Sequence, residues 1–165
     1  MMVTRASSVR YIMMTDPIAI QDTYPEDAAH CYGCGRLNVD GIQIKTYLVG
    51  VDTLTVFDPW PSHTAFEGTV YGGLIASVID CHSTGSAAIF AMVAADSEVG
   101  SEPSPRFVTA HLEIDFLAPT PLERMRVVGR LVEITARKAI VESELIVDGT
   151  TTATGSAVLV RLRDD

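Results

Sequence analysis

The sequence predicts an α+β domain in which a curved antiparallel sheet wraps around one long central helix. Residues 72–94 carry apolar and small side chains in the pattern of a largely buried helix. The last third of the chain consists of β-like runs that are separated by turn signals. Asp148-Gly149 stands between two of these runs, and Asp-Gly is a strong signal for a hairpin. One helix followed by a run of antiparallel strands is typical of this fold class.

The elements follow one another in a simple order. Residues 25–29 open with proline and acidic side chains, which suit the first turn of a short helix. Two strands are predicted before the long helix and four after it, because these segments are β-like and are bounded by glycine, proline and other turn residues. The predicted strands are residues 42–49, 53–57, 107–117, 124–135, 139–147 and 150–162.

Length and composition indicate one globular domain. The chain has 165 residues, of which 47% are hydrophobic and 20% are charged. A domain of this size removes roughly 70% of its unfolded surface from water, so it needs neither a disulfide nor a metal ion to stay folded. We expect a flexible N-terminal tail over residues 1–22 and a single domain over residues 23–165.

The charge balance excludes one class of partner. The chain has 12 lysines and arginines against 21 acidic residues, which gives a net charge of −9. Binding to a nucleic acid backbone depends on basic side chains, so no nucleic acid partner is expected. A substrate that carries phosphates would need a local basic patch on this acidic surface.

The cysteines Cys31, Cys34 and Cys81 give no disulfide framework, because their number is odd. Free cysteines favour a reducing compartment and no secretory signal is visible, so we expect a cytoplasmic protein. The apolar stretches are expected to fall short of a membrane span, and no membrane partner is expected. His30, Cys31 and Cys34 could ligate zinc, but a single C-x2-C pair is a weak signal. We therefore expect a structured loop and no metal.

The start of the long helix is a candidate for carbonyl binding. Gly72 and Gly73 would let the backbone approach a ligand closely. The free N–H groups of the first turn, together with the helix dipole, can hold a developing oxyanion. The alternative is that both glycines only allow the helix to enter a crowded sheet.

Asp80 is the second candidate, because it lies in an otherwise apolar helix and a lone buried carboxylate is costly. At helical spacing Ser77, Ser83 and Thr84 are expected on its face, where their hydroxyls could orient a water molecule or satisfy the carboxylate. The alternative is a solvated aspartate on the exposed stripe of the helix.

Geometry links the two candidates to a dimer. Gly72 and Asp80 are eight residues apart, which is about 12 Å along a helix. A nucleophile and an oxyanion donor must both lie within about 3 Å of one carbonyl group. One helix cannot meet both conditions, so catalysis would need two helices, most simply across a two-fold axis.

His82 follows Asp80 by two residues, which places the two side chains about 200° apart around a helix. A His–Asp pair within one chain is therefore not expected, and His82 is interpreted as a packed or interface residue. The same spacing argues against a hydratase that pairs a carboxylate with histidine. Neither a Gly-x-Ser-x-Gly motif nor a glycine-rich phosphate loop is present.

Three blocks of sequence occur in one order. CYGCG stands at residues 31–35, VYGG at residues 70–73 with Asp80 seven residues later, and HLEIDFLAP at residues 111–119. Together they resemble hotdog-fold thioesterases of the PaaI type, in which His-Gly-Gly usually precedes a helix that bears Asp or Glu. The resemblance covers about residues 30–162 and implies a hotdog fold.

The resemblance also implies a mechanism. Asp80 would act as general base on water or as nucleophile on a thioester carbonyl. Backbone N–H groups near Gly72 and Gly73 of the other subunit would hold the oxyanion, and Thr84 would help place the water or the carboxylate. The expected substrate is an acyl-CoA, whose acyl group would lie in an apolar tunnel at the interface of a homodimer or a dimer of dimers. No cofactor is expected beyond the coenzyme A of the substrate.

One residue departs from the family pattern, because Tyr71 stands where histidine is usual. His63 could supply an imidazole instead. The departure leaves a second function open, that of a non-catalytic acyl-CoA or ligand-binding protein, and a purely structural partner protein is the remaining alternative. The candidate substrate contacts are Tyr71, His63, Ser77, Arg106, Arg137 and Lys138. The three basic residues among them are candidates for contacts to the phosphates of a coenzyme A tail that would lie along the surface.

Overall fold

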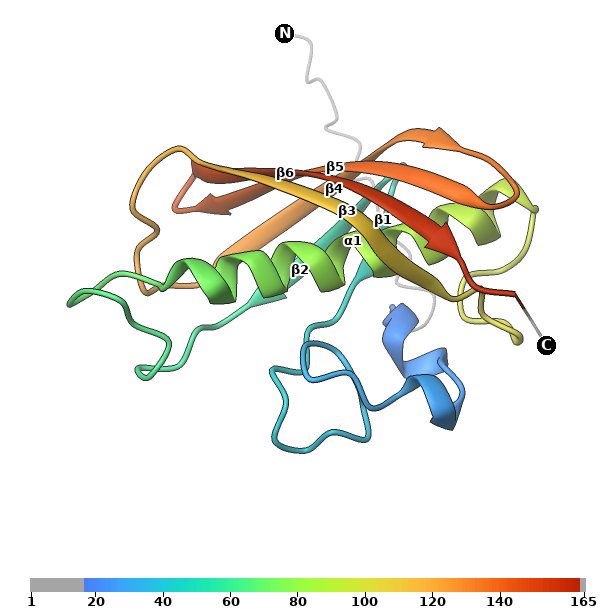
Figure 1. Cartoon of the computed structure of the whole chain (residues 1–165), viewed down its shortest axis with the longest axis horizontal. Coiled ribbons are helices and arrows are strands. Elements are labelled where there is room, and N and C mark those ends of the chain that lie inside the picture. Colours follow the sequence, from blue (N-terminus) through green and yellow to red (C-terminus); the bar gives the residue numbers. More distant parts are fainter. Residues whose placement is uncertain (1–16, 164–165) are drawn as a thin grey trace, which may run out of the picture.

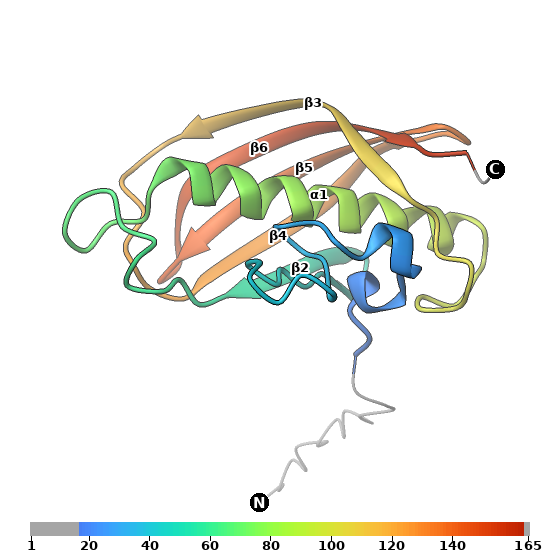
Figure 2. The same cartoon turned by 60° about the horizontal axis from the view of Figure 1, so that its bottom comes forward.

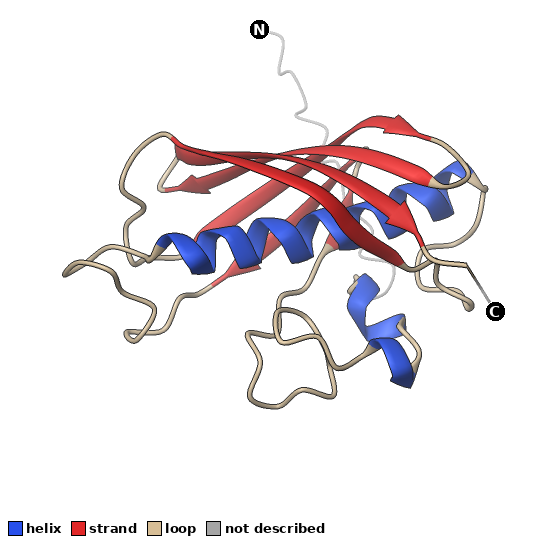
Figure 3. Cartoon of the chain, in the orientation of Figure 1, coloured by secondary structure: helices blue, strands red, loops and turns tan. Residues whose placement is uncertain are grey.

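One long helix lies under a curved antiparallel sheet (Figure 1), in a computed structural model that describes residues 17–163. The helix, α1 (Gly72–Ala94), occupies the bounds that the sequence predicts. Figure 3 separates this single long helix from the strands that arch over it. The predicted fold class, a sheet wrapped around one central helix, is confirmed.

Within residues 17–163 all strand pairs are antiparallel, and the order across the six-stranded sheet is β1-β2-β4-β5-β6-β3. The first strand after the helix, β3, therefore lies at one edge and pairs with β6. Asp148 and Gly149 have φ angles of 46° and 76°, the left-handed pair that a two-residue hairpin turn requires. The strands are β1 (Tyr47–Val49), β2 (Asp52–Phe57), β3 (Phe107–Phe116), β4 (Met125–Ile134), β5 (Lys138–Val147) and β6 (Thr150–Arg161).

The strand predicted over residues 42–49 is wrong in its first half, because only Tyr47–Val49 joins the sheet. Ile42 and Ile44 are buried, but their backbone N–H groups donate to carbonyls of the preceding loop. Those carbonyls belong to Tyr32 and Gly33, at 2.8 and 2.9 Å. The two alternate apolar side chains pack into the core beside α1, but the backbone between them pairs with a loop rather than with a strand.

The boundary expected after residue 22 is also placed too late. A short 3-10 helix, η1 (Ile20–Thr23), begins before it, and both Ile20 and Gln21 are fully buried. Gln21 donates to the Thr46 hydroxyl at 2.9 Å and accepts from the Thr46 N–H at 2.8 Å. The domain thus begins before residue 20. Residues 1–16, the rest of the predicted tail, lie outside the described residues.

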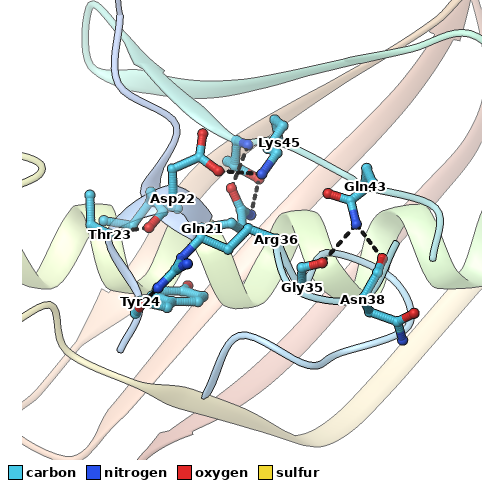
Figure 4. A network of polar contacts seen from close by, with 11 residues as sticks. Gln21, Asp22, Thr23, Tyr24, Gly35, Arg36, Asn38, Gln43 and Lys45 are labelled. Atoms are coloured by element: carbon cyan, nitrogen blue, oxygen red, sulfur yellow. Dashed lines mark hydrogen bonds and ion pairs between the residues drawn. The ribbon is translucent and has the colours of Figure 1, made fainter. Parts of the chain in front are cut away.

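Residues 17–46, here called the N-terminal segment, cover the side of α1 that the sheet leaves open (Figure 2). Polar contacts hold this segment together (Figure 4): Lys45 pairs with Asp22, and the Gln43 amide donates to two loop carbonyls. A Cβ built on Gly85 of the helix would lie 2.6 Å from the Gln21 amide nitrogen, so only glycine allows this approach. The second half of α1 is therefore enclosed on both sides, whereas residues 72–80 keep an open side.

Helix α1 is long and apolar enough to match a membrane span by length and composition alone. The prediction that all apolar stretches fall short of a span is therefore wrong for this segment. Most of the helix is buried against the sheet and the N-terminal segment, which is the reason for its apolar composition.

Candidate functional site

Asp80 lies on the open side of α1 and is partly buried. Its carboxylate accepts a hydrogen bond of 2.5 Å from the hydroxyl of Thr109, which stands on strand β3. The carboxylate is thus positioned by a neighbour on another element rather than left in bulk solvent. Thr109 was not among the residues singled out from the sequence, because a threonine in a β-strand is ordinary and the contact spans 29 residues.

A bulge in β3 orients this threonine. Thr109 pairs with Leu159 of β6, but His111 pairs with the next residue, Val158, so Ala110 is an extra residue without a partner. Such a bulge changes which side chains face the core. As a result, Thr109 reaches the helix at Asp80, while Leu112, three residues later, also packs inward.

Asp80 and Thr109 line a cavity of about 350 Å³ whose wall is mainly apolar. The cavity lies between α1, the start of β3 and the N-terminal segment. A concave, largely apolar space with a few polar groups is typical of a small-molecule site. Its lining residues are Tyr24, Ala28, Cys31, Cys34, Asp80, Cys81, Thr84, Arg106, Phe107, Val108, Thr109 and Leu162.

The three hydroxyl residues expected beside Asp80 separate in the structure. Thr84 lines the same cavity, and its hydroxyl donates to the Cys81 carbonyl at 3.0 Å. Ser77 donates to the Gly73 carbonyl at 2.9 Å and lies outside the cavity lining. Ser83 is buried on the sheet side, 3.3 Å from the Ser143 hydroxyl, so its expected place on the face of Asp80 is wrong.

The start of α1 presents unused backbone donors. Gly72 and Gly73 are exposed, and no described residue accepts a hydrogen bond from either N–H group. The N-cap residue, Tyr71, makes no side-chain cap. First-turn N–H groups without partners, at the positive end of the helix dipole, can bind a carbonyl oxygen or an anion.

Strand β3 runs alongside α1 and links its two candidate regions. At one end Thr109 contacts Asp80, and at the other a Cβ built on Gly72 would lie 3.4 Å from the ring of Phe116. Strand and helix therefore run in opposite directions over residues 72–80. Within one chain the carboxylate and the free N–H groups stay about 12 Å apart along the helix.

His63 lies beside the helix start and stacks on Trp60, with ring centroids 4.8 Å apart. Its Nδ1 accepts from the Trp60 N–H at 3.0 Å, so the neutral ring carries its proton on Nε2. Partial burial lowers the pKa of His63, which favours this neutral form. The ring centroid of Tyr71 is 6.5 Å away. The structure thus brings His63 and Tyr71 together beside the glycine pair.

Of the three basic residues considered for phosphate contacts, only Arg106 lines the cavity with Asp80. It pairs with Asp27 at 3.0 Å. Arg137 and Lys138 lie at the turn between β4 and β5. Lys138 forms an ion pair with Glu133. It is paired with Val160 in the sheet, whereas the next pair, Ala139 and Leu159, is buried, so Lys138 lies on the sheet face that points away from α1.

His82 is fully buried and points into the sheet. Its Nδ1 lies 2.9 Å from the Thr55 hydroxyl, and its Nε2 lies near those of Thr53 and Ser86. The interpretation of His82 as a packed residue is confirmed, and it takes no part in the open side of the helix. Burial lowers its pKa to about 3, so the ring is neutral in the folded protein.

This burial predicts a pH dependence of stability. In the unfolded chain His82 binds a proton near its ordinary pKa of about 6.5, whereas the folded protein resists protonation, so stability falls as the pH drops below about 6.5. Between about pH 7 and pH 5, the wild type is expected to lose about 2 kcal/mol more unfolding free energy than His82→Asn. Urea unfolding at both pH values measures this, and equal losses in both proteins would contradict it.

The loop that carries Cys31 and Cys34 lies against α1 at Cys81. All three sulfur atoms lie within 4.8 Å of one another. Hydrogen bonds from the thiols of Cys34 and Cys81 lower the pKa of Cys31. Sequence reasoning considered only the C-x2-C pair with His30 and missed Cys81, whose approach depends on how the N-terminal segment folds over the helix.

Known proteins share this architecture. A thioesterase superfamily protein from Shewanella loihica PV-4 is 42% identical, with 87% of this chain and 99% of that chain covered and a TM-score of 0.65. The PaaI protein from the phenylacetic acid degradation operon of E. coli is 12% identical, with coverages of 74% and 81% and a TM-score of 0.60. A thioesterase from Haemophilus influenzae is 9% identical, with coverages of 79% and 85% and a TM-score of 0.63. No curated protein gives a significant match.

The two more distant structures share the hotdog fold with this chain. Two findings show the family of this chain. One is the 42% identity to the protein from Shewanella loihica, and the other is the match of residues 67–154 to the family model of the thioesterase superfamily. That match contains the glycine pair, Asp80 and Thr109. Because it spans more than half of the sequence, and because a relative at 42% identity covers most of the chain, this protein belongs to the thioesterase superfamily.

Proposed function

We propose that this protein hydrolyses acyl-CoA thioesters to a free acid and coenzyme A. One observation carries the proposal: a carboxylate, Asp80, is held by Thr109 at the wall of a largely apolar cavity of about 350 Å³, in a chain of the thioesterase superfamily. Burying a carboxylate even partly costs free energy of folding, so a role in binding or chemistry explains its presence at this wall better than a role in stability.

Asp80 would supply the base or the nucleophile. As a base it takes a proton from water while the water attacks the thioester carbonyl, and as a nucleophile it attacks the carbonyl itself. In both cases the thiolate of coenzyme A leaves, and in the second case water then hydrolyses the mixed anhydride formed on Asp80, which releases the free acid and restores the carboxylate. Thr109 donates to one carboxylate oxygen and leaves the other oxygen available. Thr84, in the same cavity, is the second hydroxyl that can position water there.

The oxyanion donors would come from a second copy of the chain. The free edge of β3 offers unpaired backbone groups, which suit pairing with another strand. If two β3 strands pair antiparallel about a two-fold axis near their middle, the Thr109 end of one meets the Phe116 end of the other. Since the Phe116 ring lies beside Gly72, with 3.4 Å to a Cβ built there, this pairing would carry the free N–H groups of one helix toward Asp80 of its partner.

The proposed hydrolysis itself uses no cofactor beyond the coenzyme A of the substrate. The apolar wall suits the acyl chain, and Arg106 at the same cavity suits a phosphate of coenzyme A. Arg137 and Lys138 would contact the substrate only if its coenzyme A tail continued over the outer surface of the sheet. The thioester carbonyl would be bordered by the Tyr71–His63 pair. Ser77, which lies between the glycine pair and Asp80 on α1, would border it as well. We propose a cytoplasmic homodimer, or a dimer of dimers, acting on soluble substrate.

A panel of acyl-CoAs tests the proposal. We expect thiol release from at least one member of a set with short, long and aromatic acyl groups, with a kcat in the range of about 1–10³ s⁻¹ that is usual for enzymes. Free thiol is measured with a chromogenic disulfide, and binding is measured in parallel by calorimetry.

The two readouts separate the proposal from its alternative. Binding without release from any member would overturn hydrolysis and favour an acyl-CoA-binding protein, with Tyr71 in place of the usual histidine as the first residue to explain. Neither binding nor release would remove acyl-CoA as the ligand class.

A further inference from the structure

The three cysteine thiols beside Asp80 converge from two separate parts of the chain. Cys31 and Cys34 come from the N-terminal segment, and Cys81 comes from α1, some 50 residues later. Cys31 is exposed, and the other two are buried. All three line the cavity that contains Asp80. Nothing in the proposed hydrolysis uses them.

Their spacing suits a tetrahedral thiolate site. The Cys31 and Cys81 sulfur atoms are 3.9 Å apart, and all three lie within 4.8 Å of one another. Zinc–sulfur bonds of about 2.3 Å at tetrahedral angles separate two sulfur atoms by about 3.8 Å, whereas a disulfide would require about 2.0 Å. Small shifts of the side chains would therefore bring all three to one ion.

The loop is shaped around these sulfur atoms. A Cβ built on Gly33 would lie 2.2 Å from the Cys81 sulfur, so only glycine lets that thiol enter the loop. The Gly35 N–H donates to the Cys31 carbonyl at 2.8 Å, so the loop that holds Cys31 and Cys34 is a closed turn. Hydrogen bonds around metal ligands help to orient those ligands.

We propose that Cys31, Cys34 and Cys81 bind one zinc ion, with the fourth position open to the cavity. Thiolates are the ligands that zinc prefers in structural sites, and three protein ligands with an open position are a known arrangement. The ion ties the N-terminal segment to α1 one residue after Asp80. Binding replaces the thiol protons, which are released to solvent. This inference does not depend on the proposed hydrolysis.

Metal analysis of the full-length protein tests the site. The protein is purified without a metal-affinity tag and without chelator, and zinc is measured by mass spectrometry. We expect about one zinc per chain in the wild type and a small residual fraction in Cys31→Ser. Because Cys31 is exposed, its replacement is the mildest of the three and should leave the fold intact.

His30→Ala is the matched control, because His30 is exposed beside Cys31 and lies outside the sulfur cluster. It should retain zinc. Cobalt added to metal-free wild type should give the intense thiolate-to-cobalt absorption, and Cys31→Ser should weaken it.

Three results would overturn the inference. The first is a wild type that neither contains nor takes up zinc while three free thiols titrate. The second is a Cys31–Cys81 disulfide in freshly purified protein. The third is loss of zinc in His30→Ala or full retention in Cys31→Ser, since either would show a different set of ligands.

Discussion

Replacing Asp80 with asparagine is expected to lower kcat for thioester hydrolysis by about 10²–10⁴-fold, the usual contribution of a general base. Asparagine has the shape of aspartate, and its carbonyl oxygen can still accept the hydrogen bond from Thr109. The fold should therefore persist while the proton acceptor is lost. Thiol release at saturating acyl-CoA measures the effect, and urea unfolding verifies that stability is retained.

Asp148→Asn provides the matched control. Asp148 is exposed at the turn between β5 and β6 and lies outside the cavity lining and away from strand β3, so the variant makes the same change in net charge without touching the site. Its kcat should stay within about two-fold of the wild type, since distant surface charges act weakly through solvent. If Asp80→Asn turned over as fast as Asp148→Asn, Asp80 would have no part in the chemistry.

The two halves of the site should complement each other across a dimer. Asp80→Asn removes the carboxylate, and Gly72→Val places a branched side chain over the N–H groups at the helix start. Each variant alone should be nearly inactive. A random mixture of subunits should recover roughly a quarter of wild-type activity, because half of the dimers are mixed and each mixed dimer has one intact site.

Subunit exchange is verified by giving the two variants different tags and purifying the mixed dimer. Gly72→Ala is the control for Gly72→Val, because its Cβ would lie 3.4 Å from Phe116, an ordinary contact, and would leave the N–H groups accessible. Verified mixed dimers without activity would place carboxylate and donors in one chain. That result would contradict the site shared between subunits, although hydrolysis by Asp80 could still hold.

The elements with regular periodicity were predictable from sequence. The bounds of α1 match the prediction, and the Asp148-Gly149 hairpin follows from its turn residues. Residues 42–46 show where local pattern fails. Their alternation marks burial correctly, but it cannot tell whether the backbone pairs with a strand or with a loop. That choice depends on the loop about ten residues earlier, where the carbonyls of Tyr32 and Gly33 accept from Ile42 and Ile44.

The candidate site divides in the same way. Asp80 and the glycine pair could be recognised, because a carboxylate in an apolar helix and two glycines at its start are unusual locally. Thr109 and Cys81 could not be recognised from the sequence. Their places in the site come only from contacts with Asp80 and Cys31, which are 29 and 50 residues away along the chain. The bulge at Ala110, which aims Thr109 at the helix, leaves no signal in composition or alternation.

If the proposed hydrolysis holds, the enclosure of the second half of α1 determines which parts of the chain could change to accept a different acyl group. Side chains on that half are packed between sheet and N-terminal segment, so enlarging them would strain the core. The cavity wall opposite the helix is different, because it is formed by Tyr24 and Ala28 of the N-terminal segment and by Val108 of β3. Variation in chain length or shape of the substrate would thus be accommodated in the loops and the edge strand, while the helix that carries the carboxylate stays constant.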